Sequence, residues 1–226
     1  METNFLSLLP QWACHWLRLG AVLLLTTMLT ACQQSDKYEG SSTKILESTD
    51  SNLSIATFAG GCFWCTESDF DKLPGVIATI SGYIGGTVVN PTYRQVVAGE
   101  TGHVEAVEVY FDSTKTDFAK LLAAYWLTID PLTPNQQFCD SGTQYRSAIF
   151  YHNDEQRKLA EASRVTLETS GRFMQPIVTE ILPASVFYPA EEYHQDYYIK
   201  NPLRYTYYRK NCGRDARLAE LWESSD

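Results

Sequence analysis

The strongest constraint on the fold is the stretch TFAGGCFWCTE at residues 57–67, which directly follows an apolar segment typical of a β-strand. Gly60 and Gly61 allow a tight turn and a close approach of another molecule, because neither residue carries a Cβ atom. The residues from Cys62 to about position 73 have the pattern of a helix. The sequence therefore predicts that Cys62 lies at a junction between a strand and a helix.

Strands and helices alternate along the rest of the chain. The sequence predicts strands at residues 53–58, 76–83, 103–111, 147–151 and 177–182. It predicts helices at residues 62–73, 117–129 and 153–169, with Asp117 as a possible N-cap, and a tyrosine-rich helical segment at residues 190–200. This interleaving favours an α/β or α+β fold.

The first 31 residues have the features of an export signal. An apolar run at residues 21–29 follows Arg18 and is too short to span a bilayer as a lasting helix. The run leads into the tetrad Leu29-Thr30-Ala31-Cys32, which resembles the lipobox of bacterial lipoproteins. This resemblance implies cleavage before Cys32 and lipid on its sulfur. A plain signal peptide with an incidental cysteine is the alternative.

Composition divides the remainder into a tether and a domain. Residues 32–52 are polar and contain too few apolar side chains to form a core, so we expect a flexible tether. Residues 53–226 are then one globular domain, exported and lipid-anchored to the bacterial cell envelope on its periplasmic or outer-membrane face. The chain as a whole carries a net charge of −9, which gives it no electrostatic reason to bind nucleic acid.

The pair of cysteines at positions 62 and 65 permits three interpretations. A helix that begins at Cys62 favours its thiolate and makes it a plausible nucleophile, flanked by the apolar faces of Phe63 and Trp64. A zinc site is disfavoured, because Cys139, Cys212 and the four histidines contain no second close pair of ligands. A thioredoxin-like disulfide exchanger using Cys62 and Cys65 is the serious rival, and an inert pair in a core is the plainest alternative.

Glu105 is an unexpected carboxyl group in a predicted strand. Strict alternation places it on the same face as Val107, Val109 and Phe111, whereas Glu108 points the other way. A carboxyl group on an apolar face tends to be desolvated and protonated, as a general acid requires. The alternative is that Glu105 lies on a solvated edge of the sheet.

Several motifs together resemble those of the A-type peptide methionine sulfoxide reductases. In order along the chain they are GCFW at 61–64, GYIGG at 82–86, NPTYR at 90–94, GHVEAV at 102–107 and GTQYRS at 142–147. The resemblance covers roughly residues 55–222. It implies an α/β fold around a ferredoxin-like βαββαβ core with added helices and long loops.

The resemblance also implies roles for individual residues. Cys62 attacks the sulfoxide sulfur, and Glu105 protonates the departing oxygen. Tyr93 and Tyr145 hydrogen-bond that oxygen, Asp140 lies near the substrate, and Phe63 and Trp64 hold the S-methyl group. The products are methionine and a Cys62 sulfenic acid, and the family acts on the S epimer of the sulfoxide.

A second thiol must then condense with the sulfenic acid, and three cysteines are candidates. Cys65 is nearest in sequence, although a disulfide within the first helical turn needs local adjustment. Cys212 lies in the C-terminal region where other family members keep a resolving cysteine. Cys139 departs from the family pattern, as does Ser141.

The sequence thus predicts a monomeric enzyme that reduces oxidised methionine in proteins, with the free amino acid as a further substrate. We expect no metal or organic cofactor, and we expect electrons to come from thioredoxin or a thioredoxin-like protein. The runner-up enzyme is a thioredoxin-type disulfide oxidoreductase using Cys62 and Cys65, in which Glu105 has no role. A lipid-anchored binding protein that captures peptides through its aromatic loops is the non-enzymatic rival.

Overall fold

A β–α–β–β–α–β unit forms the centre of the protein. The computed structural model describes residues 52–223. The unit contains β1 (Leu53–Gly60), α3 (Phe63–Phe70), β2 (Val76–Ile84), β3 (Val104–Asp112), α5 (Phe118–Leu127) and β6 (Ser147–Tyr151). Within this region the main sheet has the order β7-β6-β1-β3-β2-β8, and its four central strands pair with one another in antiparallel fashion. The predicted ferredoxin-like core is therefore confirmed.

Two short strands extend the sheet at its edges. On one side β7 (Glu180–Pro183) runs parallel to β6, after the long helix α6 (Asp154–Thr169). On the other side β8 (Tyr188–Pro189) pairs with β2. The strand predicted from residue 177 begins only at Glu180, because Val178 donates its backbone N–H to the carbonyl oxygen of Pro131 at 2.8 Å.

Aromatic stacking fixes the end of β1 that leads to Cys62. The ring of Phe58 in β1 stacks on Phe70 of α3 at 4.9 Å and on Tyr125 of α5 at 5.0 Å between centroids. The buried Tyr125 hydroxyl donates to the carbonyl oxygen of Ala59 at 2.8 Å. Asp117 caps α5 as predicted, since its side chain accepts from the backbone N–H of Lys120. The strand and both helices are thus held together just before the Gly60–Gly61 turn.

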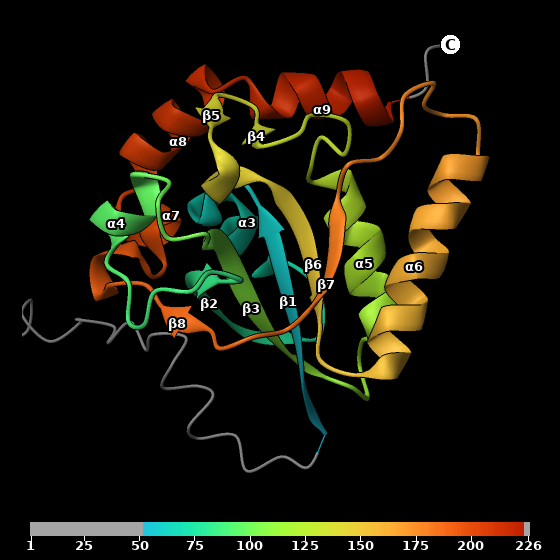
Figure 1. Cartoon of the computed structure of the whole chain (residues 1–226), viewed down its shortest axis with the longest axis horizontal. Helices are drawn as coiled ribbons and strands as arrows, with labels where there is room; N and C mark the ends of the chain where they lie inside the picture. Colours follow the sequence, from blue (N-terminus) through green and yellow to red (C-terminus); the bar gives the residue numbers. More distant parts are fainter. Residues whose placement is uncertain (1–51, 224–226) are drawn as a thin grey trace, which may run out of the picture. The chain divides into compact units, whose positions relative to one another are not determined.

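The helices of the C-terminal part of the chain differ from those that the sequence predicted. The predicted helix at residues 190–200 is wrong as a continuous element, because Asp196 adopts a left-handed conformation (φ 54°) between a 3₁₀ helix (Glu192–His194) and α7 (Tyr197–Lys200). Two further helices, α8 (Pro202–Asn211) and α9 (Arg214–Trp222), were not predicted. Figure 1 shows them beside the hairpin of β4 (Gln136–Gln137) and β5 (Asp140–Ser141), at the end of the sheet where the arrow of β1 points.

The predictions for residues 1–51 lie outside the described residues. They concern the export signal, the lipid anchor on Cys32 and most of the tether. Within residues 52–223, every helix is too short or too polar to cross a bilayer.

Candidate active site

One pocket brings together residues that are far apart in the sequence. It has a volume of about 510 Å³ and lies where α3 begins. Its lining includes all the residues to which the sequence resemblance gave catalytic or substrate-binding roles, namely Cys62, Phe63, Trp64, Tyr93, Glu105, Asp140 and Tyr145. It also includes Cys139, Tyr197, Arg204, Tyr207, Tyr208, Asn211 and Cys212. A larger pocket of about 710 Å³, over the starts of β1, α5 and α6, has no cysteine among its described lining residues.

The glycine turn places Cys62 at the N-cap of α3. Gly61 has φ +81°, and a Cβ atom there would lie 2.4 Å from the Cβ atom of Gln137. Gln137 is itself fixed, because its side-chain amide bonds both the backbone N–H and the carbonyl of Asp130, at 2.9 and 2.7 Å. Only glycine therefore lets the chain turn against this loop and present Cys62 to the pocket.

The Cys62 thiol is protonated in the resting protein. Burial raises its pKa well above the ordinary value, and a hydrogen bond with the Cys65 thiol and the nearby Glu105 and Asp140 act in the same direction. Burial therefore outweighs the effect of the helix N-terminus. The expectation that the start of α3 favours a Cys62 thiolate is wrong for this state.

Cys65 lies behind Cys62 in a different electrostatic environment. The two thiols hydrogen-bond to each other, and the backbone N–H of Cys65 donates to the carbonyl oxygen of Cys62 at 3.1 Å. The hydrogen bond with Cys62 lowers the pKa of Cys65 to about 7, and the cations Arg214 and Arg209 assist. Cys65 is thus the more acidic thiol of the pair.

Glu105 is a buried acid in the middle of the sheet. It lies on β3 opposite Tyr83 of β2, and because the residue is buried the alternative of a solvated edge is excluded. Its side chain is 2% exposed, and burial raises its pKa to about 8, as the strand alternation predicted. The carboxyl group accepts a hydrogen bond from the backbone N–H of Phe63 at 3.0 Å. A protonated carboxyl group therefore lies beside Cys62 at neutral pH.

Two tyrosines supply neutral hydroxyl groups to the pocket. Tyr93 begins the short helix α4 (Tyr93–Val97), and its backbone N–H donates to Glu191 at 2.9 Å. Tyr145 ends a 3₁₀ helix (Thr143–Tyr145). Burial raises the pKa of both hydroxyl groups well above their usual range. Both are therefore hydrogen-bond donors under ordinary conditions.

Trp64 is held rigidly by two partners that the sequence analysis did not assign to the site. Its ring stacks on Tyr197 with a centroid distance of 3.7 Å and an interplanar angle of 7°. Its indole N–H donates to Nδ1 of His194 at 3.0 Å. Burial lowers the pKa of His194 to about 4, so the imidazole is neutral and can accept this bond. His194 is itself buried and packs against the aromatic residues of the pocket, Phe63, Trp64 and Tyr93.

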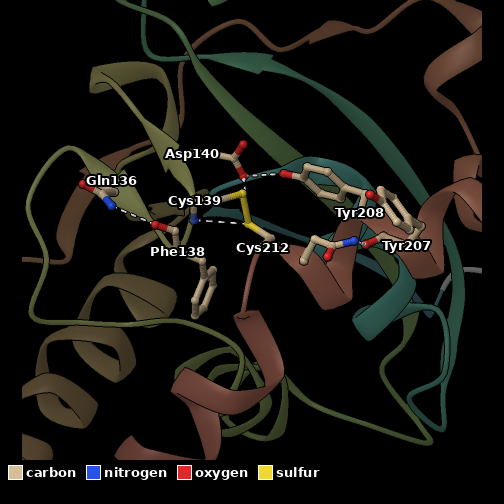
Figure 2. Close-up of a disulfide and its surroundings, with 8 residues drawn as sticks. Gln136, Phe138, Cys139, Asp140, Tyr207, Tyr208 and Cys212 are labelled. Atoms are coloured by element: carbon tan, nitrogen blue, oxygen red, sulfur yellow. Dashed lines mark hydrogen bonds between the residues drawn. A yellow bond between two sulfur atoms is a disulfide. The ribbon is translucent and has the colours of Figure 1, made fainter.

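A disulfide between Cys139 and Cys212 forms another part of the pocket lining (Figure 2). Asp140, next to Cys139, accepts a hydrogen bond from Tyr208, one helical turn before Cys212. Cys139 and Cys212 were predicted only as separate candidates for the resolving cysteine, and their pairing was not predicted. Cys62 and Cys65 are the free cysteines of the described region. Sulfur and oxygen atoms of Cys139, Asp140 and Cys212 lie within 4.8 Å of one another, but the disulfide leaves no thiolate there to bind a metal.

A buried arginine ties the C-terminal helices to the active-site turn. Arg214, at the start of α9, is 1% exposed and donates to the carbonyl oxygens of Gly60 at 3.1 Å and Thr128 at 2.8 Å. Its guanidinium group also lies 4.5 Å from the ring centre of Phe138. Nothing in the local sequence around Arg214 indicates these contacts.

Comparisons with known proteins agree on one family. A family model described as peptide methionine sulfoxide reductase matches residues 54–226. A peptide methionine sulfoxide reductase MsrA from Halalkalibacterium halodurans is 54% identical over 173 residues, which are 76% of this chain and 98% of the relative. A peptide methionine sulfoxide reductase MsrA/MsrB from Vibrio cholerae is 50% identical over 177 residues, which are 78% of this chain and 47% of the relative.

Solved structures give the same result. Methionine sulfoxide reductase A of Corynebacterium diphtheriae is 36% identical, with a TM-score of 0.61 over 69% of this chain and 78% of that one. Mxr1 from Saccharomyces cerevisiae in reduced form is 34% identical, with a TM-score of 0.62 over 67% of this chain and 87% of that one. These similarities do not favour the disulfide oxidoreductase that was the runner-up. The chain therefore belongs to the A-type peptide methionine sulfoxide reductases and reduces methionine sulfoxide to methionine.

Proposed function

We propose that Cys62 performs the reduction and that Glu105 is its acid. The Cys62 sulfur attacks the sulfoxide sulfur while Glu105 donates a proton to the departing oxygen. The oxygen passes to Cys62, which becomes a sulfenic acid, and the Cys62 thiol proton restores the proton on Glu105. Methionine is released with its sulfur reduced by two electrons. The observation that carries this proposal is the buried Glu105 bonded to the residue adjacent to Cys62 in the same pocket.

The rest of the pocket suits the S epimer of a methionine sulfoxide. The hydroxyl groups of Tyr93 and Tyr145 donate to the sulfoxide oxygen, and the apolar faces of Phe63 and Trp64 contact the S-methyl group. Asp140, which also lines the pocket, lies near the substrate. A chiral sulfur held at its oxygen and at its methyl group presents only one configuration correctly to Cys62. The substrates are oxidised proteins and peptides, and free methionine sulfoxide also fits.

Cys65 is the resolving cysteine in this proposal. Its thiol already contacts Cys62, and attack on the sulfenic acid forms a Cys62–Cys65 disulfide and releases water. Cys62 is the N-cap and has non-helical backbone angles (φ −50°, ψ 116°), so the adjustment that a disulfide requires falls outside the body of α3. Reduced thioredoxin or a thioredoxin-like protein returns the enzyme to the dithiol state, without a metal or an organic cofactor.

We further propose that the enzyme is an exported monomer anchored to the bacterial cell envelope by lipid on Cys32. The apolar run and the lipobox-like tetrad support this location. Growing expressing cells with a labelled fatty acid tests it. The wild-type chain should incorporate the label and Cys32→Ser should not, whereas equal labelling of both chains would contradict the anchor.

Steady-state kinetics with the separated epimers of a methionine sulfoxide peptide test the proposed chemistry. The S epimer should be reduced and the R epimer should not, and Cys62→Ser should abolish turnover. A disulfide oxidoreductase would instead exchange disulfides without any need for the sulfoxide. Equal reduction of both epimers would contradict the proposed orientation of the substrate.

A further inference from the structure

Arg204 is a cation without a partner at the rim of the active-site pocket. It lies in the first turn of α8, is exposed, and is the one basic side chain among the described residues that line the pocket. Within residues 52–223 it makes no hydrogen bond or ion pair. By contrast, Arg209 of α8 pairs with Asp69 at 2.8 Å, and Arg217 of α9 pairs with Asp130 at 2.9 Å. The charge of Arg204 is therefore available to a ligand.

Helix α8 places Arg204 one turn before a residue that contacts the nucleophile. Tyr208 follows Arg204 by four positions, so the two side chains project from the same face of the helix. The Tyr208 hydroxyl contacts the Cys62 thiol. One helical turn advances about 5.4 Å, and adjacent residues of a polypeptide have Cα atoms about 3.8 Å apart. A group directly beside the methionine sulfoxide is therefore within reach of Arg204 when the sulfoxide lies at Cys62.

The carboxyl groups that line the pocket have partners other than Arg204. Glu105 accepts a hydrogen bond from the backbone N–H of Phe63 at 3.0 Å. Asp140 accepts one from the Tyr208 hydroxyl, as Figure 2 shows. The guanidinium group of Arg204 therefore keeps its planar fork of N–H donors for a carboxylate that arrives with the substrate.

We propose that Arg204 binds a carboxylate adjacent to the oxidised methionine and gives the enzyme a preference for substrates with a negative charge beside the sulfoxide. This carboxylate is the side chain of a neighbouring aspartate or glutamate, or the α-carboxylate of the methionine sulfoxide residue itself. The inference rests on the proposed function, because it names the substrate class of the same site.

The overall charge of the chain makes this preference diagnostic of a local site. A net charge of −9 repels acidic substrates at long range, so without Arg204 they should be reduced more slowly than neutral ones. Tyr207 adds an apolar contact beside the cation, since it also lines the pocket and is 72% exposed. Its ring is available to cover the backbone of the bound substrate.

Two pairs of substrates that differ only in charge test the proposal. In the first pair, peptides with blocked ends carry methionine sulfoxide next to aspartate or next to asparagine. In the second pair, N-acetylmethionine sulfoxide carries a free carboxylate or a carboxamide. At low ionic strength, where screening is weak, the ratio of kcat/KM for the acidic and the neutral member is measured.

The wild type should favour the acidic member of at least one pair by about two- to fivefold, the range of a solvent-accessible ion pair. Arg204→Gln should lower this ratio to about one or below, and Arg204→Glu should lower it further. A change confined to the peptides assigns the carboxylate to the neighbouring side chain. A change confined to the N-acetyl compounds assigns it to the α-carboxylate.

Lys210→Gln is the matched control. It removes one positive charge from an exposed position of the same helix, but Lys210 is not among the residues that line the pocket. Its ratio should equal that of the wild type. An unchanged ratio in Arg204→Gln, or an equal decrease in Lys210→Gln, would overturn the carboxylate site. No reduction of any of the four substrates by the wild type would instead overturn the proposed function.

Discussion

Glu105 accepts a hydrogen bond at 3.0 Å from the backbone N–H of Phe63, the residue that follows Cys62. The acid lies on a central strand of the sheet and the nucleophile at the start of α3, so this bond connects two rigid elements. The position of the proton donor relative to the thiol is therefore fixed before substrate arrives. Such preorganisation is what reduction of a polar S=O bond requires.

Glu105→Gln should abolish most of the activity without disturbing the fold. Glutamine keeps an oxygen that can accept the Phe63 N–H but has no proton to donate. We expect kcat at neutral pH to fall about 10²- to 10⁴-fold, the range that a general acid contributes. Steady-state reduction of a methionine sulfoxide peptide measures this. Unchanged kcat would remove Glu105 from the mechanism.

The rate of the first chemical step should depend on the protonation of Glu105. Burial raises its pKa to about 8, so the carboxyl group is mostly protonated below that pH and ionised above it. The rate should therefore decrease as pH rises through about 8. Rapid-quench measurements of methionine formation between pH 6 and pH 10 measure this decrease. Glu105→Gln provides the control, because its rate should not decrease with pH in this way. The same decrease in both proteins would mean that a group other than Glu105 causes it.

Glu67→Gln should stabilise the protein at high pH. Glu67 is fully buried in α3, and burial raises its pKa to about 8. Between its ordinary pKa and about 8 the folded state binds more protons than the unfolded state, so stability decreases as pH rises through this range. Glutamine cannot ionise and avoids this loss.

Urea unfolding at pH 5 and pH 9 measures the effect. A pKa difference of one corresponds to about 1.4 kcal/mol, and about three pH units separate pH 5 from the Glu67 pKa of about 8, so we expect Glu67→Gln to gain roughly 4 kcal/mol relative to wild type between the two conditions. The same stability difference at both pH values would contradict the buried, protonated state of Glu67.

His194 should matter through its hydrogen bond to Trp64. In His194→Phe the buried indole N–H loses its acceptor, which costs about 1–3 kcal/mol of stability. The loosened Trp64 should also weaken substrate binding, so KM for a sulfoxide peptide should rise. His194→Asn is the matched control, because the asparagine Oδ1 can take the place of Nδ1. If both variants raise KM equally, the hydrogen bond is not the cause.

Local patterns in the sequence predicted the elements around the nucleophile. The glycine pair indicated the turn before Cys62, and the alternation around Glu105 indicated its buried face. The Asp117 cap was also predicted correctly. Each of these features depends on residues within a few positions of one another, where propensity and periodicity are informative.

Contacts between distant segments were not predictable in this way. Tyr208 and Asp140 are 68 positions apart, Cys139 and Cys212 are 73 apart, and Trp64 and His194 are 130 apart. All three depend on how the segment after residue 190 packs on the pocket. The same packing buries Cys62, which explains why the local helix argument gave the wrong direction for its pKa.

The most direct test of the central claim is a single-turnover reaction of the fully reduced protein with a methionine sulfoxide peptide. Wild type, Cys62→Ser and Cys65→Ser are compared, with methionine and the oxidation state of each cysteine measured after rapid quenching. We predict that wild type and Cys65→Ser form methionine as Cys62 is oxidised, and that Cys62→Ser forms none. Methionine formed by Cys62→Ser at the wild-type rate would contradict the assignment of Cys62 as the attacking sulfur.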